Sequence, residues 1–135
     1  MEKMTPEIYW LTLTCLMTAL MWVPYILNRI VEMGLWPALK NPQPDKNPKA
    51  QWAFRTERAH ANAVENLVIF APLAIAVHSL GLSSETTALA VMVFFFSRLA
   101  HFLIYAFGVP LLRTMAFFVG WVCQIVLGLT ILGWM

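Results

Sequence analysis

Four long apolar stretches, separated by shorter polar segments, dominate the pattern along the chain. They run from about Ile8 to Ile30, Arg58 to Leu80, Thr86 to Phe107 and Leu111 to Trp134. Each holds about 20 residues or more, which lets a helix cross a hydrocarbon core of about 30 Å. Because backbone groups in lipid must be satisfied internally, the pattern predicts four helices, with kinks at Pro24 and Pro72.

The connections between these stretches differ in length and character. The first, Trp36–Arg55, is rich in proline and charge, which predicts a polar loop that breaks helices. The second, Gly81–Glu85, and the third, Gly108–Pro110, are short turns. Short links make successive helices antiparallel, so we expect an all-α, up-down four-helix bundle that occupies residues 1–135 as one domain.

Composition supports a membrane protein and excludes two other classes. Hydrophobic residues make up 60% of the 135 residues and charged residues only 12%, with a mean hydropathy of +0.69. A soluble domain this small could not bury so much apolar surface. The formal net charge of +2 gives no basic footprint, so we expect no nucleic-acid partner. The His and Cys residues lack metal-ligand spacing, and we expect no metal site.

Basic residues predict the orientation in the membrane. They gather in the first loop and at the adjoining helix ends: Arg29, Lys40, Lys46, Lys49, Arg55 and Arg58. The Gly81–Glu85 turn carries none, and the ends of the chain contribute only Lys3. The positive-inside rule then places the first loop and the Gly108 turn in the cytoplasm and both termini on the far side.

Polar residues inside the spans gather on helix faces near that cytoplasmic side. The second span carries Arg58, Asn62 and Glu65 at i, i+4 and i+7, and the third carries Arg98, His101 and Tyr105 at i, i+3 and i+7. Arg113 opens the fourth span. By the predicted topology all seven converge on one half of the bundle. Guanidiniums, a carboxylate, an amide and a phenol there predict a pocket for a small zwitterionic or anionic ligand.

Two structural interpretations compete with a binding site. Arg58, Arg98 and Arg113 could be interfacial anchors whose charged ends extend to lipid headgroups. Glu65 could instead form an ion pair with an arginine that holds the second and third helices together. The depth of Arg98 and Glu65 inside their spans disfavours simple anchoring.

The segment Arg58–Asn66, which reads RAHANAVEN, resembles the second-helix signature Arg-Ala-His-x-Asn-x-x-Glu of the MAPEG family, the membrane-associated proteins in eicosanoid and glutathione metabolism. The set Arg98, His101 and Tyr105, followed by Pro110 and Arg113-Thr114, resembles that family's third-helix pattern. The resemblance extends over the whole chain, with four spans, a long polar first loop and short later links. It is typical of bacterial members, for which we expect the inner membrane.

The resemblance implies a homotrimer that binds glutathione as co-substrate at subunit interfaces, open toward the cytosol. It implies glutathione transferase or peroxidase activity on lipophilic electrophiles or hydroperoxides that enter from membrane lipid. Glu65 would receive the ammonium of glutathione, and Arg113 would face its sulfur as the catalytic residue. The other residues implied in glutathione binding are Arg58, Asn62, Arg98, His101, Tyr105 and, from a neighbouring subunit, Arg29.

These residue types suit that ligand, but other functions remain open. Guanidiniums bind carboxylates, and a nearby arginine favours the thiolate of a thiol whose ordinary pKa is about 8.5. A noncatalytic ligand-binding protein of the same fold is one alternative, because a fold does not establish an enzyme. A small proton-coupled exporter is another, although such exporters carry a carboxylate in the first span and Ile8–Asn28 has no charge.

Overall fold

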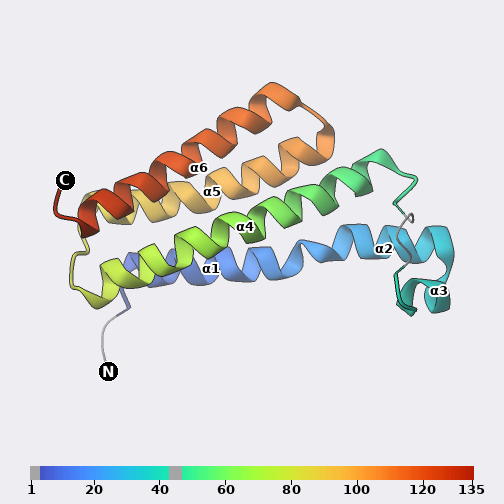
Figure 1. Cartoon of the computed structure of the whole chain (residues 1–135), viewed down its shortest axis with the longest axis horizontal. Coiled ribbons are helices and arrows are strands. Elements are labelled where there is room, and N and C mark those ends of the chain that lie inside the picture. The colour runs from blue at the N-terminus through green and yellow to red at the C-terminus, as the bar shows by residue number, and fades with distance from the viewer. Residues whose placement is uncertain (1–3, 43–46) are drawn as a thin grey trace.

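The computed structural model describes residues 4–42 and 47–135, and within these ranges the regular structure is entirely helical (Figure 1). The helices are α1 (Pro6–Leu20), α2 (Trp22–Met33), α3 (Leu35–Leu39), α4 (Gln51–Ser79), α5 (Glu85–Phe107) and α6 (Pro110–Ile131). Four stretches are long and apolar enough to cross a membrane: Pro6–Met33, α4, α5 and α6. The predicted four spans are therefore confirmed.

The four stretches run alternately up and down, as the short links predict. Figure 1 shows the start of α1 and the end of α6 beside the α4–α5 turn, and the α5–α6 turn at the opposite end with α3. A hydrogen bond fixes that second end, since Arg55 Nε on α4 donates to the carbonyl of Ala106 on α5 at 3.1 Å. Gly108 closes α5 with φ +78°, and a Cβ there would lie 3.2 Å from the Arg55 guanidinium carbon. Only glycine suits this turn, because its backbone is left-handed and its neighbour is close.

The first span is interrupted at one residue, whose backbone stays in the right-handed helical region at φ −67° and ψ −19°. α1 ends at Leu20 and α2 begins at Trp22, so Met21 separates two helices. Pro24 explains the interruption, because a proline ring clashes with the carbonyl four residues earlier, here that of Leu20. His60 of α4 contacts residues on both sides of this interruption. Its Nδ1 shares a hydrogen bond of 2.7 Å with the Tyr25 hydroxyl, and its ring also forms a hydrogen bond with the backbone of Thr18. By contrast, α4 continues through Pro72 as one helix.

The predicted start of the second span is wrong by seven residues, because α4 begins at Gln51 rather than near Arg58. The first loop is correspondingly shorter than Trp36–Arg55 and also contains α3. Apolarity marks only the part of a helix that meets lipid, and the charged first turns of α4 extend beyond it. Glu32 of α2 stabilises this start, since its carboxylate accepts from the backbone N–H groups of Lys49 at 2.9 Å and Ala50 at 3.4 Å.

A buried carboxylate lies at the end of the bundle with the α4–α5 turn, where the pattern of apolar residues did not predict one. Glu7 in the first turn of α1 is fully buried and accepts from the hydroxyls of Ser83 at 2.9 Å and Thr87. Ser84 and Thr87 form a capping box at the start of α5, so Glu7 lies at a helix N-terminus, where negative charge is favoured. The first helix therefore does contain a carboxylate, but hydroxyl groups of the same chain already bond it.

Small residues line the buried side of α4 and bring its neighbours close. Ala53, Ala59, Ala63 and Ala74 are all buried there, and Phe70 stacks on Phe94 of α5 with ring centroids 3.8 Å apart. Small residues at helix contacts let backbones approach closely in membranes. This packing holds the alanine-rich face of α4 inward and brings α4 close to α5.

Candidate functional site

Arg98 lies at the centre of a buried polar cluster between α4 and α5. Its side chain is only 2% exposed. Its Nη2 donates to Oδ1 of Asn62 at 2.6 Å and lies 3.4 Å from Nδ1 of His101, which is also buried. Its Nε and Nη1 are buried without a hydrogen-bond partner among the described residues. This burial does not fit an interfacial anchor, and the guanidinium retains donors for an anion or for water.

Two residues that the sequence analysis missed extend this cluster into α6. Asn66 Nδ2 donates to the carbonyl of Asn62 at 2.9 Å, and Gln124 Nε2 donates to the carbonyl and Oδ1 of Asn66 at 3.2 and 3.3 Å. Asn66 and Gln124 are both buried. Their signal was present in the sequence, since Asn66 follows Asn62 by one helical turn and Gln124 is the one carboxamide in α6.

The cluster continues toward the start of α6 through two rings and a second guanidinium. The rings of His101 and Tyr105 meet edge to face with centroids 5.6 Å apart. The guanidinium carbon of Arg113 lies 4.4 Å from the centroid of the Tyr105 ring, a cation–π contact. The structure thus brings together Asn62, Arg98, His101, Tyr105 and Arg113 in one row, which we call the polar row.

Arg58 and Glu65 do not join the polar row inside this chain. Both are exposed, and Asn62 between them is half-buried. Ala59 and Ala63 hold the inward face of α4, so the stripe that shares one helix face looks away from the interior of its own bundle. Within one chain the predicted convergence therefore includes Asn62 and the residues of α5 and α6, but not Arg58 and Glu65. No ion pair between Glu65 and an arginine exists among the described residues.

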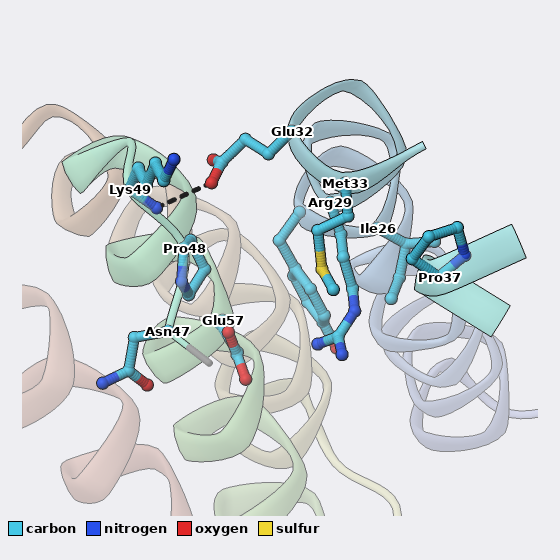
Figure 2. Close-up of a pocket in the computed structure, with 10 residues that line it drawn as sticks. Ile26, Arg29, Glu32, Met33, Pro37, Asn47, Pro48, Lys49 and Glu57 are labelled. Atoms are coloured by element: carbon cyan, nitrogen blue, oxygen red, sulfur yellow. Dashed lines mark hydrogen bonds between the residues drawn. The ribbon is translucent and has the colours of Figure 1, made fainter. Parts of the chain in front are cut away.

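Arg29 lies apart from the polar row and lines a cavity of about 400 Å³ between α2 and the first turns of α4 (Figure 2). Glu32 and Glu57 also line this cavity, together with residues 47–49 of the loop. Within one chain Arg29 therefore belongs to a different site from Arg98 and Arg113.

Comparison with protein families supplies the identification. The family model described as the MAPEG family matches residues 8–133, which is nearly the whole chain. The chain belongs to the MAPEG family. A comparison with curated proteins gave no match. Together with its four apolar helices, membership identifies an integral, multi-pass membrane protein.

MAPEG proteins include glutathione transferases and peroxidases as well as other members, some of them without enzymatic activity. MAPEG members typically bind glutathione and act as oligomers in membranes. Both properties bear on the polar row, whose half-buried Asn62 shares a helix face with the exposed Arg58 and Glu65.

Proposed function

We propose that this MAPEG protein is a glutathione transferase or peroxidase that acts on lipophilic electrophiles or hydroperoxides. The observation that carries the proposal is the buried guanidinium of Arg98, which has unused donors and directly contacts Asn62. A cation this deep in a membrane helix, without a carboxylate of the described residues in contact, is typical of a functional site that binds an anion.

The charges of the polar row and of the adjoining stripe on α4, which consists of Arg58, Asn62 and Glu65, match those of glutathione. The tripeptide carries two carboxylates, one ammonium and one thiol. Arg58 is available for a carboxylate, Asn62 offers an amide, and Glu65 is available for the ammonium. His101 and Tyr105 would line the same site beside Arg98, which either contacts the ligand or holds Asn62 in place.

The exposure of the stripe supports assembly with other copies of the chain. Charged side chains facing lipid are costly, yet Arg58 and Glu65 are exposed on a membrane-spanning helix. A neighbouring subunit and the bound ligand would cover them. We propose a homotrimer with one glutathione at each subunit interface, where Arg29 would reach the ligand only from the neighbouring subunit.

Arg113 is the residue we propose to face the sulfur. It is the fourth residue of α6, where the helix dipole adds positive potential to its own charge. Its guanidinium lies over the Tyr105 ring, a position that leaves the N–H groups at its edge free to donate. These donors would stabilise the thiolate, which attacks the electrophilic carbon. A carbon–sulfur bond forms, and the leaving group departs with its electron pair.

We propose that the end of the bundle with α3 and the Gly108 turn faces the cytoplasm of a bacterial cell, from the excess of lysine and arginine there. Glutathione would then enter from the cytosol. The lipophilic substrate would enter from the bilayer, because membrane lipid surrounds the helices.

Glutathione titration of the purified oligomer, with a turnover assay, tests the proposal. Glu65→Gln should weaken glutathione binding about 10-fold or more, since one charge-assisted contact is lost. Arg113→Ala should lower turnover more than affinity, because its contact strengthens with negative charge on sulfur. Glu85→Gln, an exposed carboxylate at the opposite end, is the matched control.

Three results would count against the proposal. If wild-type protein fails to bind glutathione, the site serves another anion. If it binds glutathione without turnover on any electrophile or hydroperoxide, the protein is a ligand-binding member of the family. If bound thiol titrates with the same pKa in wild type and Arg113→Ala, Arg113 has no role at the sulfur.

A further inference from the structure

The cavity beside Arg29 is lined by residues of a single chain and lies between α2, α3 and the start of α4 (Figure 2). Its volume of about 400 Å³ falls in the range of small-molecule sites, roughly 300–1,000 Å³. Ile26, Met33 and Pro37 give it an apolar side, and Arg29 and Glu57 give it charge. It is therefore a mixed site rather than a gap between apolar side chains.

Four charged residues line this cavity, and two of them, Arg29 and Glu57, have no oppositely charged partner among the described residues. Arg29 Nε is buried without a hydrogen-bond partner, and Arg29 and Glu57 form no ion pair, among the described residues. Glu32 is not available, because its carboxylate already accepts from Asn28 and from the backbone of Lys49. A cation and an anion thus face one space without neutralising each other, which suits a ligand that carries both charges.

The cavity lies where the bundle meets the headgroup region of a membrane. The apolar stretch of the first span ends here at Met33, and Trp36 and Trp52 are exposed close by in sequence, at 68% and 44%. Exposed tryptophans are typical of the membrane–water interface. A lipid headgroup is therefore the nearest abundant ligand.

We propose that this cavity binds a zwitterionic group with an anionic oxygen and a primary ammonium, supplied by the headgroup of phosphatidylethanolamine. The phosphate would bind Arg29, and the ammonium would donate to Glu57. Quaternary ammonium headgroups lack these N–H donors, and phosphoglycerol headgroups lack the cation. This inference goes beyond the proposed function: Arg29 would bind the lipid phosphate within its own chain, in place of the contact with a neighbouring subunit's glutathione.

Native mass spectrometry of the intact oligomer tests this inference, after equilibration with vesicles of equal parts phosphatidylethanolamine, phosphatidylcholine and phosphatidylglycerol with identical acyl chains. Phosphatidylethanolamine should be retained preferentially. Arg29→Gln and Glu57→Gln should each lower its retention by about 10- to 100-fold, the loss expected for one charge-assisted hydrogen bond. Ile26→Trp should also lower retention, because it fills the cavity and leaves both charges in place.

Lys40→Gln and Glu85→Gln are the matched controls, since both remove an exposed charge that does not line the cavity. Circular dichroism and oligomer mass confirm that each variant is folded. Equal retention of the three lipids, or equal retention by wild type, Arg29→Gln and Glu57→Gln, would overturn the inference.

Two further measurements distinguish a lipid from a soluble zwitterion as the ligand, and this inference from the proposed function. If soluble phosphoethanolamine binds as tightly as the lipid, the zwitterion site stands but a lipid as its occupant is overturned. If glutathione displaces the lipid, and Glu57→Gln weakens both ligands alike, the cavity belongs to the glutathione site and the inference fails. If wild type retains the lipid but does not bind glutathione, the proposed function fails and this inference stands.

Discussion

The hydrogen bonds between Asn66 and Gln124 make a sharp test of the buried cluster. Leucine at position 124 removes the amide that Asn66 accepts from, and leucine at position 66 removes the Oδ1 acceptor and leaves the Gln124 amide only the backbone carbonyl of residue 66. Both side chains are buried, so water cannot replace the lost partner easily. Replacing both residues by leucine removes donor and acceptor together.

The structure sets the order of the three destabilisations. Interhelical hydrogen bonds in membranes average about 0.6 and reach about 1.7 kcal/mol. An unsatisfied buried partner costs about 1–3 kcal/mol. We expect Gln124→Leu to cost about 1–2 kcal/mol. Asn66→Leu should cost about 1 kcal/mol more, because Asn66 also donates to Asn62. The double variant should cost less than the sum by about 1 kcal/mol, since no single partner is left unsatisfied.

Equilibrium unfolding in mixed micelles of a mild detergent and dodecyl sulfate measures these free energies. Thr130→Val is a matched control in the same helix, because Thr130 only donates to the Val126 carbonyl one turn earlier. Strict additivity of the two leucine substitutions would refute the reasoning. A Gln124→Leu variant as stable as wild type would refute it as well.

Three more predictions concern the ends of the bundle. A cysteine introduced at Asn47 should stay unlabelled by an impermeant reagent in intact cells while one at Ser84 is labelled; the reverse pattern would invert the orientation. Gly108→Ala should destabilise by roughly 1–2 kcal/mol in the same unfolding assay, because a side chain there is strained in the left-handed region and crowds Arg55; an unchanged midpoint would contradict this. Glu7→Ala should loosen the start of α5, seen as faster hydrogen exchange of its first amides by mass spectrometry, because the Ser83 and Thr87 hydroxyls lose their acceptor; unchanged exchange there would show that the capping box suffices.

The sequence predicted the helices well because lipid leaves few alternatives. Apolar length and short turns determine four antiparallel spans, and both features can be read directly from residues. The start of α4 at Gln51 was missed because a helix that extends into water loses its apolar signature but not its hydrogen bonds. The kink expected at Pro24 is an interruption at Met21, because the steric effect of a proline falls several residues before the proline itself.

The residues of the candidate site could be predicted from the sequence, but the direction in which the polar face of α4 is turned could not. Helical spacing correctly places Arg58, Asn62 and Glu65 on one face, yet spacing alone does not tell which way that face is turned. Buried alanines determine the direction of this face, because they fill the inward side of α4 and turn Glu65 outward. Gln124 was missed because a lone amide in an apolar helix carries no periodic signal.

The alanine face of α4 also limits how this protein can change over generations. A residue larger than alanine at the buried Ala59 or Ala63 would push α4 away from the helices packed on it, so most substitutions there would be eliminated. The opposite face meets no such restriction from its own chain. Packing within the chain therefore restricts the outward side of the same helix less, one turn away from positions that can hardly vary at all.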